Sequence, residues 1–168
     1  MQLFTLLQQS IHADHDLRNL MTSQILFWML HAPDGHAKNF SIQLQPGTSG
    51  RFRLTPMYDV MSAYPVVGGG PNQWAAQDLK LAMALLGKNR HYHMHKIQRR
   101  HFNSTAKRVG FGENAEPLLQ ELIARTSEVI EQVQAELPPG FSQQVADTVF
   151  AGLWRSARAL EAMPAFGI

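Results

Sequence analysis

A Pro-Pro-Gly break at residues 138–140 separates two long segments whose apolar residues recur every three or four positions. That spacing places the apolar side chains on one face of a helix, and a Pro-Pro-Gly run ends a helix. The apolar positions are Leu118, Leu119, Leu122, Ile123, Thr126, Val129, Ile130 and Val133 before the break, and Val145, Val149, Phe150, Leu153, Trp154 and Leu160 after it. We therefore predict two helices, the second with Ser142 as its N-cap.

The first half of the chain mixes helix and strand signals. Residues 17–30 predict a buried helix, because their leucine, isoleucine and methionine residues fall near one helical face. That helix must end before Pro33, since the residue preceding a proline is pushed out of the α region. Residues 40–44 and 52–54 alternate between apolar and polar around a turn at residues 46–50, which predicts a β-hairpin.

Residues 79–86 suit either a strand or a helix, and their alternation favours a strand that turns at residues 87–89. These segments together predict an α+β fold that is mainly α-helical, with one or two small β-hairpins. A length of 168 residues with 45% apolar residues suits one domain, 1–168. Trp28, Trp154 and Phe150 lie on apolar helix faces and are predicted to be core residues.

The composition excludes several classes of function. The chain has no cysteine, which excludes disulfides and thiolate chemistry and suits the reducing cytoplasm, where we expect the protein. The longest apolar run, residues 25–30, is far shorter than the roughly 20 residues of a membrane span, so no membrane partner is predicted. Residues 1–7 lack the basic start of a signal peptide. A formal charge of +2 is too small to predict direct contact with nucleic acid.

A cluster of polar groups follows the first helix. Residues 34–39 read Asp-Gly-His-Ala-Lys-Asn, and the next acid, Asp59, lies at the far end of the predicted hairpin. Because a hairpin folds back on itself, Asp59 can return close to Asn39. Phosphoryl transfer needs a carboxylate that accepts the substrate hydroxyl and oxygen ligands that hold Mg²⁺. Asp34, Asn39 and Asp59 repeat the order of these groups in protein kinases, although Asp and Asn are also common turn residues.

Three stretches resemble the C-lobe motifs of HipA-type toxin kinases: residues 32–41 (APDGHAKNFS), 54–60 (LTPMYDV) and 78–83 (DLKLAM). The resemblance continues through residues 99–102 and, more loosely, through the closing helices, so it covers nearly the whole chain. It implies a kinase-like C-lobe and, for full-length bacterial members, serine/threonine phosphorylation of a cytoplasmic protein with ATP and Mg²⁺ as cofactors. The partners that it implies are an aminoacyl-tRNA synthetase as substrate and a DNA-binding antitoxin.

The resemblance also implies roles for individual residues. Asp34 corresponds to the catalytic base, and Asn39 and Asp59 correspond to the Mg²⁺ ligands. The positions that correspond to ATP-binding residues are His36, Ala37, Lys38, Asn39, Tyr58 and Asp59. Lys38 can offset phosphate charge, and His36 can donate a hydrogen bond to the γ-phosphate. Tyr58 ends a strand, where core packing is common, and only the resemblance places it near the nucleotide.

The chain begins about one helix before this motif, which departs from the family pattern. Nothing upstream supplies a Gly-rich phosphate loop, the strand lysine or an adenine-binding hinge. The glycines at residues 68–70 precede Pro71 and predict a flexible loop, not a substitute. We therefore expect the N-lobe to be absent from this chain or supplied by a separate chain, and the chain alone to transfer phosphate poorly or not at all.

Two other functions are open at this point. A non-catalytic module could contact an antitoxin, a partner lobe or nucleic acid through the basic stretch at residues 88–101, although the small net charge favours a solvated surface over a DNA site. A metal site could form at His91, His93 and His95, which alternate along the predicted strand. Side chains on one side of a strand converge poorly on a single ion, so this alternative is the weaker of the two.

Overall fold

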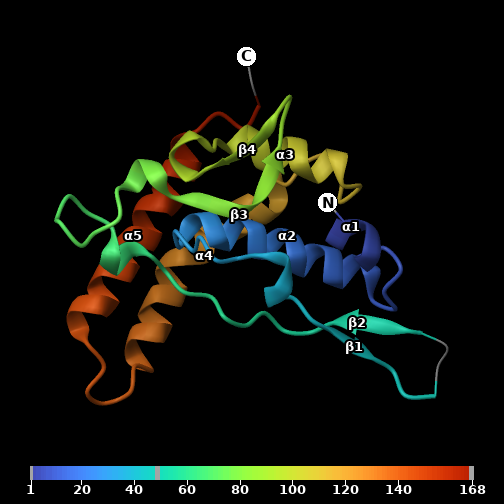
Figure 1. Cartoon of the computed structure of the whole chain (residues 1–168), viewed down its shortest axis with the longest axis horizontal. Helices are drawn as coiled ribbons and strands as arrows, with labels where there is room; N and C mark the ends of the chain where they lie inside the picture. The colour runs from blue at the N-terminus through green and yellow to red at the C-terminus, as the bar shows by residue number, and fades with distance from the viewer. Residues whose placement is uncertain (1, 48–49, 167–168) are drawn as a thin grey trace.

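Helix α2 (Ala13–Met29) lies in the middle of the molecule, with the other elements arranged around it (Figure 1). The computed structural model of this chain describes residues 2–47 and 50–166. The other helices are α1 (Gln2–Leu7), α3 (Arg99–Arg108), α4 (Glu116–Ala135) and α5 (Gln143–Ala162), and single 3-10 turns are η1 (Ala37–Asn39), η2 (Tyr64–Val66), η3 (Ala76–Asp78) and η4 (Met94–Lys96). Among the described helices, none is long and apolar enough to cross a membrane.

The buried face predicted for residues 17–30 is confirmed. Leu20, Met21 and Ile25 are at most 1% exposed, because their spacing puts them on the side of α2 that faces the core. The helix ends before Pro33, as predicted, with a backbone hydrogen bond of 3.1 Å from the His31 N–H to the Trp28 carbonyl. His31 then takes a left-handed conformation (φ 49°), which turns the chain away from the helix axis.

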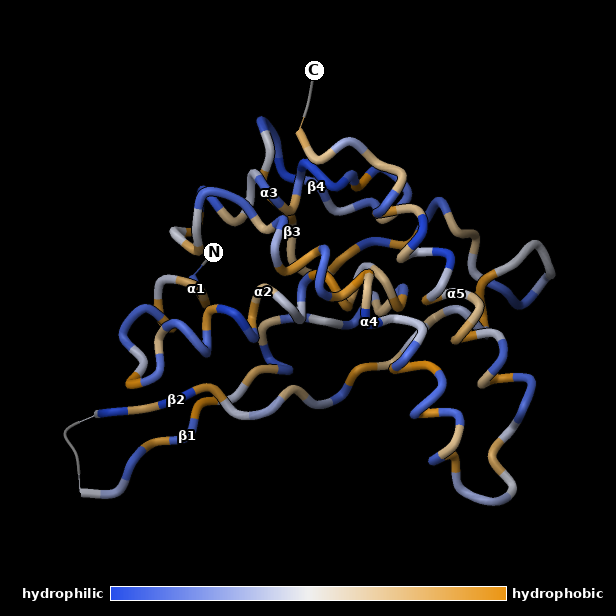
Figure 2. Tube along the Cα trace, turned by 180° about the vertical axis from the view of Figure 1, so that it is seen from behind, coloured by the Kyte–Doolittle hydropathy of each residue, from blue (hydrophilic) through white to orange (hydrophobic). Residues whose placement is uncertain are grey.

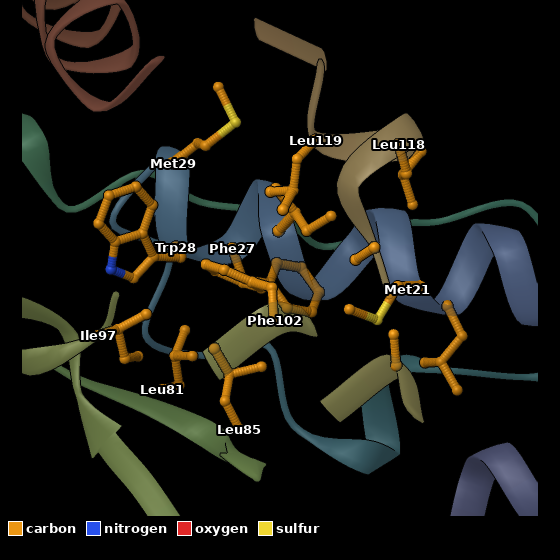
Figure 3. Packing of buried hydrophobic residues seen from close by; sticks show 14 of the residues in the cluster. Met21, Phe27, Trp28, Met29, Leu81, Leu85, Ile97, Phe102, Leu118 and Leu119 are labelled. Carbon is orange, nitrogen blue, oxygen red and sulfur yellow. The ribbon is translucent and has the colours of Figure 1, made fainter. Parts of the chain in front are cut away.

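The core forms where α2 meets α3 and the second hairpin (Figure 3). Phe102 is fully buried, and its ring meets the Trp28 ring edge-on with 6.1 Å between centroids. Trp28 is 5% exposed, which confirms the predicted core position, and its Nε1 donates to the Met94 carbonyl at 2.9 Å. Hydrophobic stretches of the trace cross the middle of the molecule around α2 and α4 (Figure 2). Apolar packing therefore joins the first and second halves of the chain.

Two antiparallel hairpins accompany these helices. Strand β1 (Ile42–Leu44) pairs with β2 (Phe52–Leu54), and β3 (Lys80–Leu86) pairs with β4 (Arg90–His93). Both predicted hairpins are confirmed, and the strand interpretation of residues 79–86 was correct. Residues 48 and 49 of the first predicted turn lie outside the described residues. The α+β, mainly α-helical fold class is likewise confirmed.

Helices α4 and α5 pack against each other, and Ser142 caps α5 as predicted by accepting the Val145 N–H at 3.4 Å. The prediction that Trp154 is a core residue was wrong, because this side chain is 41% exposed. Phe150 is only partly buried. The joined ends of the two helices project beyond the rest of the molecule (Figure 1). The Arg158 guanidinium, 4.0 Å from the Trp154 ring centroid, covers the indole instead.

Candidate active site

The polar cluster begins in a tight loop directly after α2. The Ala32 N–H donates to the Phe27 carbonyl at 2.8 Å, which folds the loop back over the end of the helix. Gly35 then passes so close to Phe27 that a Cβ at this position would lie 2.3 Å from the aromatic ring. A glycine is therefore required for close packing here. Its neighbour Asp34 is held at the surface, with its side chain 58% exposed.

Asn39 ties the two ends of the cluster together. Its Nδ2 donates to the Asp34 carbonyl at 2.9 Å, and the His36 N–H donates to the same oxygen at 2.7 Å. The Asn39 residue is only 7% exposed, so the bond is well shielded. Because Nδ2 is used in this bond, the amide oxygen Oδ1 is the group left to accept a donor or bind a cation. The structure thus brings Asp34 and Asn39 into contact.

The residues between them differ in accessibility. His36 is partly buried, and its Nε2 lies 3.4 Å from Asp34 Oδ1. Ala37 and Lys38 are exposed on the short turn η1. The loop therefore presents a carboxylate with an imidazole beside it, followed by an accessible ammonium group.

Tyr58 connects this loop to the segment that follows the first hairpin. Its hydroxyl donates to the Lys38 carbonyl at 3.3 Å and lies 2.8 Å from Ser41 Oγ. The backbone adds a third link, from the Thr55 N–H to the Ser41 carbonyl at 2.9 Å. Tyr58 is 42% exposed, so the core-packing interpretation was wrong. Its phenol is instead a surface group that holds two loops side by side.

Asp59 follows immediately and has an unusual backbone conformation. Its φ of 56° is in the left-handed region, where a residue with a side chain costs about 1 kcal/mol. Such conformations persist where the surroundings impose them, and they are common at active sites. The carboxylate is exposed. Asp59 is the next residue in the chain after Tyr58, whose hydroxyl contacts the Lys38 carbonyl.

Asp16, which the sequence reasoning did not single out, anchors the first hairpin. It is 1% exposed, and its Oδ2 accepts from Ser10 Oγ at 2.5 Å and from the Leu54 N–H at 2.7 Å. Burial alone would raise the pKa of Asp16, but these hydrogen bonds outweigh it and lower the pKa. Its position four residues before Leu20 on the buried face of α2 was the available signal.

Comparison with known proteins identifies the family of this chain. The sequence model of the HipA-like C-terminal domain matches residues 1–135, up to the last residue of α4. The chain belongs to this family.

A solved HipA structure has the same fold as this HipA-like domain. HipA from the Shewanella oneidensis MR-1 toxin–antitoxin system, in a complex of HipA, HipB and its operator DNA, superposes with a TM-score of 0.71 over 94% of this chain. The two sequences are 17% identical, so the likeness concerns the fold alone. The chain spans 34% of the length of that HipA chain.

In this HipA-like domain, the basic stretch at residues 88–101 is only partly accessible. Arg99 is 7% exposed and pairs with Glu116 through two nitrogens, at 2.5 and 3.0 Å from Oε2. Burial would raise the pKa of Glu116, but hydrogen bonds from Arg99 and Asn103 lower it. His101 is also 7% exposed. The cations that remain on the surface are Lys88, Arg90, Lys96 and Arg100.

The three-histidine metal site is contradicted. Over residues 2–47 and 50–166, no group of three or more His, Asp or Glu side chains is placed to hold a metal ion. Strand β4 ends at His93, so His95 lies on η4 and the alternation is broken. His91 is engaged elsewhere, because its ring stacks on His101 with 3.7 Å between centroids.

Proposed function

We propose that this domain carries the catalytic-loop part of a HipA-like serine/threonine kinase that uses ATP and Mg²⁺ to phosphorylate a cytoplasmic protein. An aminoacyl-tRNA synthetase is the substrate class that the family resemblance implies. The observation that supports this function best is the junction of two loops at Tyr58, whose hydroxyl contacts Lys38 and Ser41. Through that junction, Asp59 follows directly after a residue in contact with the loop that holds Asp34 and Asn39.

The residues present suit a magnesium nucleotide. Mg²⁺ usually takes one or two protein oxygens and completes its shell with water and phosphate. Asp59 offers an exposed carboxylate, and Asn39 offers the oxygen of an amide whose nitrogen is already bonded. Bound MgATP would supply the phosphoryl group. A donor set of one carboxylate and one amide therefore fits this ion without a further protein ligand.

Each remaining side chain has a role in the proposed site. The exposed Asp34 carboxylate would accept the proton of a serine or threonine hydroxyl, with His36 Nε2 3.4 Å away to orient it or to donate to phosphate. The exposed Lys38 ammonium would offset phosphate charge, and the backbone of the exposed residue Ala37 would lie against the nucleotide.

Nucleotide binding tests this function without requiring turnover. We would titrate the chain with ATP by calorimetry, with and without Mg²⁺, and expect binding that depends on Mg²⁺ and is lost in Asp59→Ala. Asp14→Ala is the matched control, because Asp14 is an exposed carboxylate in the first turn of α2. ATP binding that is independent of Mg²⁺, or that Asp14→Ala weakens as much as Asp59→Ala does, would contradict the proposal.

A second candidate is a non-catalytic module that contacts an antitoxin or DNA. Its support is the exposed set of Lys88, Arg90, Lys96 and Arg100, together with the HipB and operator DNA of the solved HipA complex. Duplex DNA would bind with an affinity that falls steeply between about 50 and 200 mM salt. Arg90→Glu should weaken binding and Arg125→Glu, on exposed α4 surface, should not. Affinity that is flat in salt excludes the DNA version.

A further inference from the structure

A pocket of about 520 Å³ opens directly beside Asp34. Its volume is within the roughly 300–1,000 Å³ typical of ligand pockets. It is lined by Pro33, Asp34, Met61, Ser62, Ala63, Val66 and Trp74. Three of the apolar side chains are widely exposed, Met61 at 65%, Val66 at 45% and Trp74 at 54%. Single exposed apolar residues are ordinary, but several around one concave site indicate binding.

The pocket walls are held by hydrogen bonds to the backbone and not by burial of these side chains. The Trp74 N–H donates to the Val66 carbonyl at 2.8 Å, which joins two walls of the pocket. The third wall is fixed to the end of α2, since Ser62 Oγ donates to the Leu30 carbonyl at 2.7 Å. The exposed apolar surface is therefore presented on a framework that exists before any ligand binds.

The lining determines the kind of occupant. Among the lining residues, Asp34 is the single charged group, so an anionic ligand such as a phosphate would meet repulsion and no cation. A neutral apolar group, in contrast, would cover Met61, Val66 and Trp74 and remove them from water. It would also lie next to the carboxylate that the proposed reaction uses.

We propose that this pocket binds a large apolar side chain of the polypeptide substrate, one or two residues from the serine or threonine that is phosphorylated. Neighbouring residues of an extended chain are about 3.3 Å apart along its axis, so a hydroxyl at Asp34 brings the next side chains to the pocket. This substrate preference rests on the proposed kinase function, because Asp34 is the link between hydroxyl and pocket.

Peptide binding to the full chain tests the preference. The probes are short peptides with a central serine among alanines, a lysine at each end, and either alanine, leucine or phenylalanine at one position near the serine. In a Trp154→Phe background, Trp74 is the exposed indole, since Trp28 is buried. We expect leucine or phenylalanine at one or two positions to tighten binding on the order of 10-fold to 100-fold and to shift Trp74 emission to the blue.

Variants separate the pocket from the rest of the surface. Met61→Glu and Val66→Glu should each abolish the gain from leucine or phenylalanine. Val133→Glu, at a comparably exposed valine on α4, should leave it intact. Equal affinity for the apolar and all-alanine peptides, or equal loss in Val133→Glu, would overturn the inference. A blue shift that appears without peptide as protein concentration rises would also overturn it, because the occupant would then be a second copy of the chain.

Calorimetry with MgATP on the same proteins distinguishes failure of the substrate preference from failure of the proposed kinase function. Nucleotide binding that depends on Asp59, combined with no preference for apolar peptides, would remove the substrate inference and leave the kinase proposal standing. Selective capture of apolar peptides without MgATP binding would remove the kinase proposal, and with it the assignment of the occupant as a phosphorylation substrate.

Discussion

The two hairpins have the same antiparallel geometry, yet different forces attach them to the molecule. Strand β3 is held by packing, with Leu81 at 3% and Leu85 at 0% exposure. All residues of β1 are exposed, and the first hairpin is attached mainly through the buried Phe52 and the bonds of Asp16. Apolar packing makes a segment part of the global folding unit, whereas a few polar bonds allow it to open locally.

This difference coincides with the position of the proposed site. The first hairpin, β1–β2, lies between Asn39 and Asp59 in the chain. The second hairpin, β3–β4, packs into the core formed by α2 and α3. Ligand-binding segments are commonly drawn from the less stable parts of a protein. We therefore expect that the proposed nucleotide site is built on the part of the molecule that can adjust, supported by a rigid helical core.

Truncation of the packed hairpin should have the largest effect. Leu85→Ala removes a fully buried side chain and should lower the free energy of unfolding by about 2–5 kcal/mol. Leu44→Ala, in the first hairpin at 63% exposure, should change it by less than about 0.5 kcal/mol. Urea unfolding of both variants measures the contrast. Similar costs for the two leucines would mean that the hairpins are attached in the same way.

Acid should weaken the packed hairpin first, through His101, whose ring stacks on His91 of β4. Burial, His91 and Arg100 lower the pKa of His101 from 6.5 to about 4. The unfolded chain therefore takes up the proton first as pH falls. The stability that neutral His101 contributes is complete above pH 6.5 and is lost toward pH 4, in total on the order of 3 kcal/mol.

Urea unfolding between pH 7 and pH 4 measures this loss. His101→Gln should make the profile shallower, because a glutamine retains an acceptor for the Gln98 N–H but takes up no proton. Burial also lowers the pKa of His31, so part of the slope should remain. A His101→Gln profile as steep as that of the original chain would contradict the assignment.

Loss of the polar anchor should have a smaller, local effect. Asp16→Asn should cost about 1–3 kcal/mol, since buried groups that bonded to the carboxylate lose a strong acceptor. Hydrogen exchange should accelerate at the Leu54 amide, which donates to Asp16, while the β3 amides stay protected. Asp14→Asn is the exposed control. Uniform acceleration in both hairpins would show that the first one does not open on its own.

The pH dependence of this anchor differs from that of His101. Hydrogen bonds lower the pKa of Asp16 below 3.8, so its contribution is present above that pH and is lost as pH falls through the folded-state pKa. Hydrogen exchange should therefore show the two hairpins losing stability over different pH ranges. The β3–β4 hairpin should be weakened from pH 6.5 downward, and the β1–β2 hairpin only below about pH 4.

The smallest effect on stability is expected at Asp59. Asp59→Gly relieves the left-handed backbone, so the free energy of unfolding should stay the same or rise by up to about 1 kcal/mol. MgATP binding should nevertheless be lost in calorimetry. A variant that loses both stability and nucleotide binding would indicate that Asp59 is a structural residue and not a ligand.

The local sequence pattern was sufficient to predict most of the secondary structure. The helix that ends before Pro33, the two hairpins, the Pro-Pro-Gly break and the Ser142 cap were all predicted, because periodicity and turn chemistry act over a few residues. The motif of Asp34 and Asn39 was also visible, since the hydrogen bond between them spans only five residues.

Only the tertiary structure determined which side chains are buried and which distant segments they contact. Trp154 is on an apolar helix face but is 41% exposed, and periodicity alone could not show that no other segment covers it. The Tyr58 junction, the burial of Asp16 and the pocket of Met61, Val66 and Trp74 depend on segments far apart in sequence. Helical period and turn chemistry are properties of neighbouring residues, whereas burial and contact between distant segments arise only when the whole chain packs.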